Sequence, residues 1–123
     1  ESIVIGYKFR ERAGEIAEFK IVGEVKDKNV LVVDDMVDSG NTLVEAAKAL
    51  KEVDKQKKVY AYCTHGLFTE GRERICKETD LMMVTNSIPQ PQHEKIEIIP
   101  LDELFADAIY RTNEGLSLSE LFA

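Results

Sequence analysis

The chain has 123 residues, which is enough to bury one modest hydrophobic core but not several. Acidic residues outnumber basic ones by 23 to 16, and the net charge of −7 argues against nonspecific binding to nucleic acid, which depends on clustered Lys and Arg. The two cysteines show no Cys-x-x-Cys spacing, so we expect reduced, partly buried thiols. Because no apolar run approaches a membrane span and no signal peptide is visible, we expect a cytoplasmic protein without a membrane partner.

Strand and helix patterns alternate along the chain, as is typical of a single α/β domain with a mostly parallel sheet flanked by helices. Short runs rich in β-branched and aromatic residues predict strands at 3–7, 21–25, 59–64, 81–85 and 96–99. Helices are expected at 70–78 and 101–111. The last helix carries one apolar face, which we expect to lie in the core. This face comprises Leu101, Leu104, Phe105, Ala108 and Ile109.

The most informative segment runs from Val30 to Thr42 and reads VLVVDDMVDSGNT. Its apolar start predicts a buried strand of a parallel sheet, with Asp34 and Asp35 at the carboxyl end. In open α/β sheets, ligands bind in the crevice outside that end. Helical spacing of apolar residues follows, and Thr42 with Glu45 has the spacing of a capping box, so we expect a helix that begins near Thr42.

The small residues before this helix predict an anion site. Ser39, Gly40 and Asn41 leave backbone N–H groups open, and the helix dipole adds partial positive charge, so the loop can bind a phosphate. Carboxylates repel phosphate, so Asp34 and Asp35 would instead bind sugar hydroxyls or a bridging Mg²⁺. A phosphate beside a diol describes ribose 5-phosphate. The same residues would also suit an ordinary solvated turn after a strand.

This segment resembles the phosphoribosyl-diphosphate motif of type I phosphoribosyltransferases, in the version found in ribose-phosphate pyrophosphokinases. The resemblance extends over nearly the whole chain, in the order of that family. Its blocks are Tyr7–Arg12, Ile21–Val25, Val30–Thr42, Cys63–Phe68, Val84–Pro89 and Ser117–Phe122.

The resemblance implies a type I phosphoribosyltransferase-like domain at 1–123, incomplete on its amino-terminal side. Because the sequence starts without Met in an apolar strand, we expect a carboxyl-terminal piece of a two-domain subunit. The implied reaction transfers the diphosphoryl group of MgATP to the anomeric hydroxyl of ribose 5-phosphate, giving phosphoribosyl diphosphate and AMP. Family members are homo-oligomers, and we expect the isolated chain to be inactive.

The resemblance also assigns the site residues. A flexible catalytic loop at about 8–18 would carry Lys8 and Arg10, which stabilise the transferring group, and Arg10 would also touch the sugar. Mg²⁺ would be bound by Asp34 and Asp35. The ribose-5-phosphate loop would span 34–42, and the residues that bind this substrate would be Arg10, Asp34, Asp35, Asp38, Ser39, Gly40, Asn41 and Thr42.

The sequence departs from the family at three places, one of which is Phe9, where a basic residue is frequent between Lys8 and Arg10. Ser39-Gly40-Asn41 stands where many relatives carry Thr-Ala-Gly or Thr-Gly-Gly, so Asn41 adds a side chain near the phosphate, and we expect the loop to survive because Asn tolerates left-handed backbone. The segment 69–71 is also rearranged. Two alternatives remain open: a salvage phosphoribosyltransferase, for which no base-recognition segment is visible, and a non-catalytic module for ribose-phosphate binding or oligomerisation.

Overall fold

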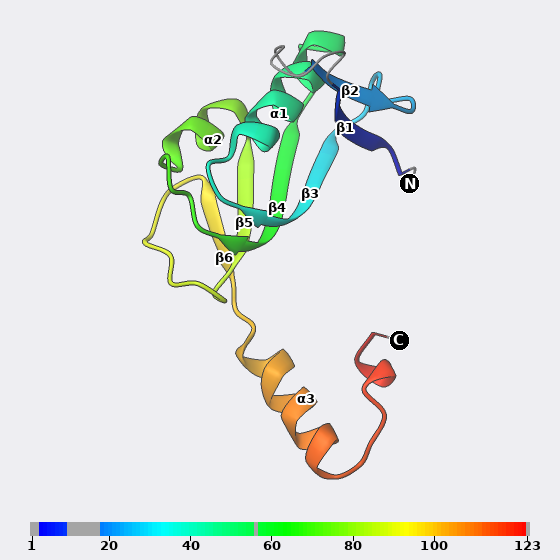
Figure 1. The fold of residues 1–123 in the computed structure, drawn as a ribbon, viewed down its shortest axis with the longest axis vertical. Coiled ribbons are helices and arrows are strands. Elements are labelled where there is room, and N and C mark those ends of the chain that lie inside the picture. Colours follow the sequence, from blue (N-terminus) through cyan, green and yellow to red (C-terminus); the bar gives the residue numbers. More distant parts are fainter. Residues whose placement is uncertain (1–2, 10–17, 56, 123) are drawn as a thin grey trace.

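The fold is built on a four-stranded sheet with parallel neighbours in the order β3-β4-β5-β6 (Figure 1). The computed structural model describes residues 3–9, 18–55 and 57–122. The strands are β3 (Val30–Val37), β4 (Val59–Gly66), β5 (Leu81–Thr85) and β6 (Ile96–Ile99). The predicted mostly parallel α/β architecture is confirmed.

Two helices cover one face of this sheet. They are α1 (Asn41–Val53) and α2 (Glu73–Glu78). Alternate residues of a strand point to opposite faces, and along β4 the side chains of Val59, Ala61 and Cys63 are fully buried while Tyr60 and Tyr62 are half-buried. The core therefore lies between the sheet and the two helices.

Both cysteines lie in this core as free thiols. Burial raises the pKa of Cys63 to about 11, and burial also raises the pKa of Cys76. Both thiols are therefore more deeply buried than the partial burial expected from the sequence.

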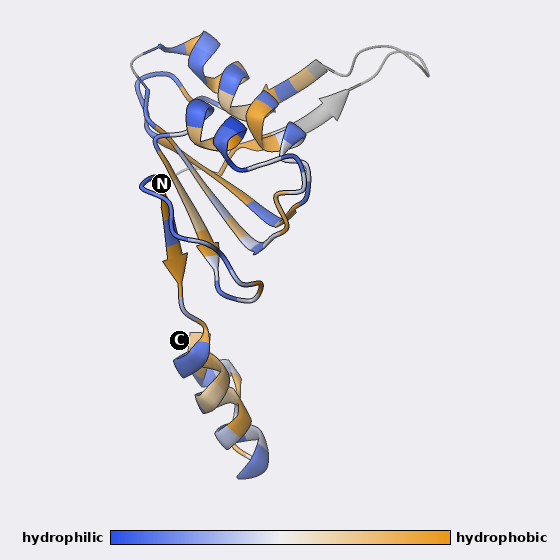
Figure 2. Cartoon of the chain, turned by 90° about the vertical axis from the view of Figure 1, so that its left-hand side faces the viewer, coloured by the Kyte–Doolittle hydropathy of each residue, from blue (hydrophilic) through white to orange (hydrophobic). Residues whose placement is uncertain are grey.

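The opposite face of the sheet is open on β3. Leu31 and Val33 are half or more exposed there, and Figure 2 shows the apolar character of the strands. Parallel sheets are normally covered on both faces, so this face is unusual for a parallel sheet.

A separate two-stranded hairpin lies beside β3 and α1 (Figure 1). Strand β1 (Ile5–Phe9) pairs antiparallel with β2 (Glu18–Val22), and Ile5 is opposite Val22. The sequence predicts both strands, but the observed limits of β1 lie two residues later than predicted and those of β2 lie three residues earlier. The apolar pattern identifies such short strands, whereas cross-strand pairing sets their limits.

The carboxyl-terminal segment extends away from the sheet. It consists of α3 (Asp102–Asn113) and a short 3₁₀-helix, η1 (Ser119–Phe122), shown in Figure 1. No residue of α3 is buried, and Phe105 and Ile109 are 57% and 69% exposed. The expectation that this apolar face lies in the core is therefore wrong, because helical spacing identifies an apolar face without identifying its partner.

Arg111 joins the two parts of this segment. Its guanidinium pairs with Asp107 one turn earlier and with Glu120 of η1 at 2.7 Å.

Among the helices that the structure describes, none combines the length and the apolar character needed to cross a bilayer.

Candidate functional site

Strand β3 positions the two adjacent carboxylates. The sequence places Asp34 and Asp35 at the end of the strand, but β3 continues to Val37. The two residues are consecutive in a strand, so their side chains point to opposite faces of the sheet. Asp34 is half-buried and lines a cavity with the following loop, whereas Asp35 is exposed and does not line it. The structure thus joins Asp34, but not Asp35, to the loop.

Local backbone groups hold both carboxylates. Asp34 Oδ1 accepts the N–H of Asp35 at 2.9 Å, and Asp35 Oδ1 accepts the N–H of Met36 at 2.7 Å. Burial raises the pKa of Asp34 above its ordinary value of 3.8, and the hydrogen bond from Asp35 N–H only partly offsets that effect. The Asp34 carboxylate is therefore under-solvated, so hydrogen-bond donors or a cation would stabilise its charged form.

The loop after β3 leads into α1, whose amino terminus is open toward the loop. Gly40 is the N-cap residue, with a φ of 80°, and it provides no side-chain cap. The helix begins at Asn41, one residue from the predicted start, but the predicted capping box is wrong because Thr42 already lies within the helix. The N–H of Asn41 makes a long contact of 3.4 Å with Ser39 Oγ, and the other N–H groups of the first turn point toward the loop, where the helix dipole places partial positive charge. Such a terminus suits an anion.

Gly40 also carries the left-handed backbone of this loop. The tolerance of Asn for left-handed backbone is not needed at position 41, because Asn41 is the first helical residue. A Cβ built on Gly40 would lie 2.7 Å from Cδ1 of Ile75, which is buried in α2. Helix α2 thus packs directly against the loop.

The connection from β4 to α2 supports the same loop from its other side. Leu67 and Phe68 donate backbone N–H groups to the carbonyl of Val37, at 2.9 and 3.2 Å. Thr69 binds Asp38 twice, through its N–H to the carbonyl and through its hydroxyl to Oδ1 at 2.7 Å. The Asp38 carboxylate is therefore already engaged by the supporting segment.

A second interaction ties α2 to the loop. Arg74 donates from Nη2 to Oδ1 of Asn41 at 2.7 Å, and its Nη1 pairs with Glu70. Arg74 was not among the residues selected from the sequence. It lies 33 residues from Asn41 in the chain, and no local pattern reveals the contact.

The loop and Asp34 enclose a small polar cavity of about 160 Å³, lined by Asp34 and residues 36–43. A larger cavity of about 950 Å³ adjoins it between the hairpin, β3 and α1. Most of the larger cavity is lined by aliphatic side chains, but it shares Asp34, Thr42 and Leu43 with the smaller one. The smaller cavity is the better match for a charged, hydroxylated ligand.

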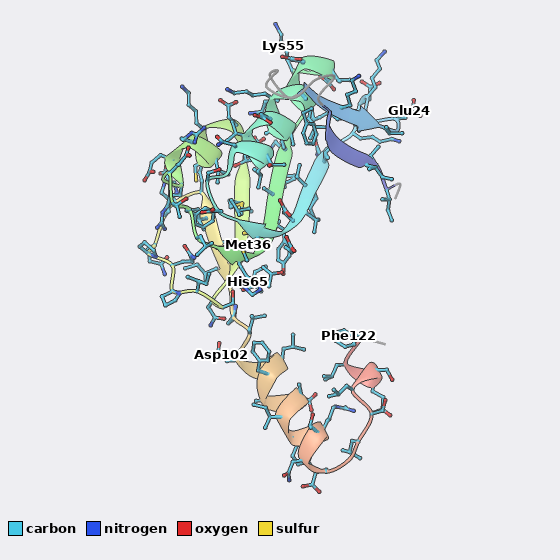
Figure 3. The ribbon with its side chains drawn as sticks, viewed as in Figure 1. Glu24, Met36, Lys55, His65, Asp102 and Phe122 are labelled. Atoms are coloured by element: carbon cyan, nitrogen blue, oxygen red, sulfur yellow. The ribbon has the colours of Figure 1, made fainter. Side chains whose placement is uncertain are left out.

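Neighbouring strands end at the same edge, as Figure 3 shows for Met36 and His65. These two residues pair across β3 and β4. His65 Nδ1 lies 2.9 Å from Ser87 Oγ, which in turn donates to the carbonyl of Thr64 at 2.9 Å. His65 thus takes part in a structural hydrogen-bond network beside the site.

Only part of the predicted catalytic loop can be located. Lys8 lies on β1 opposite Phe19, whereas Arg10 and the rest of 10–17 fall outside the described residues. Within the described part of the chain, no group of three or more His, Cys, Asp or Glu side chains is arranged to hold a metal ion. The predicted residues that the structure brings together are Asp34, Asp38, Ser39, Gly40, Asn41 and Thr42.

A parallel sheet whose first strand carries paired aspartates and leads into a glycine-capped helix defines an α/β domain, in agreement with the type I phosphoribosyltransferase-like fold that the sequence resembles. A family model described as the phosphoribosyl synthetase-associated domain matches residues 11–123. The chain belongs to this family.

Named relatives agree with the assignment. Ribose-phosphate pyrophosphokinases from Porphyromonas gingivalis and Campylobacter jejuni are 38% and 41% identical, each over 98% of this chain. The chain spans 39% and 40% of their respective lengths. The crystal structure of phosphoribosylpyrophosphate synthetase from Mycobacterium smegmatis superimposes with a TM-score of 0.74 at 26% identity, covering 89% of this chain and 37% of that one.

Proposed function

We propose that this chain provides the ribose 5-phosphate site of a ribose-phosphate pyrophosphokinase. One observation carries the proposal: the open, glycine-capped amino terminus of α1 and the under-solvated Asp34 carboxylate share one small polar cavity. Phosphate oxygens accept hydrogen bonds, whereas sugar hydroxyls can donate them to a carboxylate. Residues 38–42 would bind the 5-phosphate, and Asp34 would bind the ribose hydroxyls, whereas Asp35 lies on the opposite face of β3.

The reaction would be attack by the anomeric oxygen of ribose 5-phosphate on the β-phosphorus of ATP. The bond between the β-phosphorus and the oxygen that bridges it to the α-phosphorus breaks, AMP leaves with that oxygen, and the hydroxyl proton is released to solvent. Such transfers depend on positioning and on stabilisation of negative charge. Lys8, which lies on β1, and Arg10 would provide that charge, and Arg10 would also contact the sugar phosphate.

Mg²⁺ suits the carboxylates at this site. The ion commonly takes one or two carboxylates and completes its shell with water and substrate oxygens. Asp34 would therefore bind Mg²⁺ together with a substrate, and the ion would neutralise phosphate charge. Asp35 points to the opposite face of β3 and lies outside the small cavity. This role is compatible with hydroxyl binding by the Asp34 carboxylate.

Assembly and location complete the proposal. We propose a cytoplasmic homo-oligomer, and the exposed apolar side chains of α3 support association with another protein surface. Because the chain spans about two-fifths of its relatives' length, we propose that the isolated chain binds ribose 5-phosphate without synthesising phosphoribosyl diphosphate.

Calorimetric titration of the 123-residue chain with ribose 5-phosphate, with and without Mg²⁺, tests the proposal. We expect saturable binding that a variant with Asp34→Asn and Asp35→Asn weakens by about tenfold or more, because charge-assisted hydrogen bonds are lost. A matched control with Glu52→Gln and Glu97→Gln removes two exposed charges elsewhere and should bind normally.

Separate titrations with ribose and with inorganic phosphate test the hydroxyl-binding part and the phosphate-binding part of the site. Each of these ligands should bind more weakly than ribose 5-phosphate. Equal binding of ribose 5-phosphate by the wild type and the Asp34/Asp35 variant would contradict the assignment of the carboxylates, and absence of binding by the folded wild type would refute the proposed site.

A further inference from the structure

The side chain of Asn41 poses a chemical problem at a phosphate site. An amide has an oxygen that only accepts hydrogen bonds and a nitrogen that only donates them. Phosphate oxygens accept, so an Asn whose oxygen faced the ligand would repel it. Asn41 can support phosphate binding only if its nitrogen faces the ligand and its oxygen faces elsewhere.

Arg74 satisfies that condition in the structure. Its guanidinium carries donors only, and Nη2 lies 2.7 Å from Oδ1 of Asn41. The reverse orientation of the amide would place its nitrogen, a donor, against the donors of Arg74. The contact with Arg74 therefore fixes the positions of the amide oxygen and nitrogen of Asn41. The two N–H bonds of Asn41 are then not used by Arg74, and they remain free to donate to another acceptor.

We propose that Arg74 is a positioning residue of the phosphate site, which orients the Asn41 amide so that its nitrogen donates to the bound phosphate. This inference rests on the proposed function, and it concerns the phosphate end of the substrate. Arg74 would act through Asn41, without touching the ligand itself.

The surroundings of Arg74 favour an orienting role over a role in stability. Glu70 pairs with Nη1 and so leaves Nη2 aimed at the loop. The Arg74 and Glu70 side chains are 42% and 52% exposed, and exposed ion pairs add little to folding stability. An Arg74 variant should therefore fold normally and lose only the fixed orientation of the Asn41 side-chain amide.

Two of the three departures from the family pattern lie at either end of this network. Asn41 stands in the phosphate loop, and Glu70 stands in the segment 69–71 that precedes α2. Arg74 connects them. The Asn41 amide in the phosphate loop thus contacts the Arg74 guanidinium, which Glu70 of the segment 69–71 holds in place.

A double-mutant cycle with ribose 5-phosphate as the ligand tests the proposal. Arg74→Met should weaken binding by about two- to tenfold, the range of one hydrogen bond. In a chain that carries Asn41→Gly, the same change should have less than about a twofold effect, because no amide remains to orient. Arg74→Lys keeps a donor and should restore most of the affinity.

Two controls distinguish orientation from simple charge. Lys77→Met removes an exposed positive charge from the same helix and should leave binding unchanged. If Arg74→Met weakens binding equally with and without the Asn41 amide, Arg74 acts on phosphate through its own charge and the proposal is wrong.

Side-chain amide NMR signals test the contact without any ligand. The Nδ2 signals of Asn41 are assigned as those that disappear in the Asn41→Asp variant. Arg74→Met should shift these signals, whereas Lys77→Met should leave them in place. Unshifted signals would overturn the proposal whatever the affinity. Absence of ribose 5-phosphate binding by a wild type that shows the shift would refute the proposed function while leaving the orientation of the amide established.

Discussion

Replacement of Gly40 by Ala tests how tightly the phosphate loop is built. Gly40 has a φ of 80°, and an added Cβ would lie 2.7 Å from Cδ1 and 2.9 Å from Cγ1 of Ile75. A left-handed backbone costs an L-residue about 1–2 kcal/mol, and overpacking a core costs about 1–3 kcal/mol. Ile75 is 1% exposed and cannot move into solvent, so both costs apply.

We therefore expect Gly40→Ala to lower the free energy of unfolding by about 2–5 kcal/mol, measured by urea denaturation. Domains of this size have total stabilities of about 5–15 kcal/mol, so the variant should remain folded or nearly so. Ribose 5-phosphate affinity should also fall, because the loop must shift to relieve the contact.

Two companion variants separate the costs. Gly71 also has a positive φ, of 87°, but its Cβ would meet only the flexible end of Glu73, so Gly71→Ala should cost only the backbone part, about 1–2 kcal/mol. Ile75→Val removes Cδ1, and in combination with Gly40→Ala the total loss should be less than the sum of the single changes. Strict additivity, or equal losses for the two glycine variants, would refute the steric argument.

Two further predictions concern Asp34 and α3. Because the pKa of Asp34 is raised in the folded state, its ionisation costs stability as the pH rises above the ordinary value of 3.8. Asp34→Asn should therefore gain stability relative to the wild type between pH 3.5 and pH 7 in urea unfolding, and a relative loss would contradict the assigned shift. Replacing both Phe105 and Ile109 by Ser should change the free energy of unfolding by less than about 1 kcal/mol, because both are exposed, and should reduce concentration-dependent association in sedimentation. A loss of several kcal/mol would show that α3 packs on the core.

The sheet was the most predictable part of the fold. The predicted limits of β5 and β6 are correct, because each is a short apolar run bounded by polar or turn residues. Strand β3 is longer than predicted, since pairing with β4 keeps Asp34 and Asp35 in the sheet despite their low strand propensity. Tertiary pairing, which is invisible in a single sequence, sets such limits.

The helices show the same division between local and long-range information. Residue spacing located the start of α1 to within one residue, but the cap is Gly40 and not the Thr42–Glu45 box. The predicted helix at 70–78 begins only at Glu73, because residues up to Gly71 support the phosphate loop. For α3 the limits were nearly right and the burial was wrong, since the partner of an apolar face cannot be read from its spacing.

Sequence motifs identified the loop of the candidate site but not what holds it. Asp34 and residues 38–42 line one cavity, as the motif predicts for a sugar phosphate, while Lys8 and Arg10 remain predictions. The supports come from the β4–α2 segment, which lies about 30 residues further along the chain: Thr69 on Asp38, Ile75 against Gly40, and Arg74 on Asn41.

These supports have a physical consequence for binding. A preorganised anion site needs its donors fixed before the ligand arrives, because donors that must be ordered on binding reduce the affinity. The backbone of the loop is fixed by Thr69 and Ile75, whereas the Asn41 amide depends on the more exposed Arg74. Changes at Thr69 or Ile75 should therefore affect stability and binding together, and a change at Arg74 should affect binding alone. That difference separates a loop held by packing from a donor held by orientation.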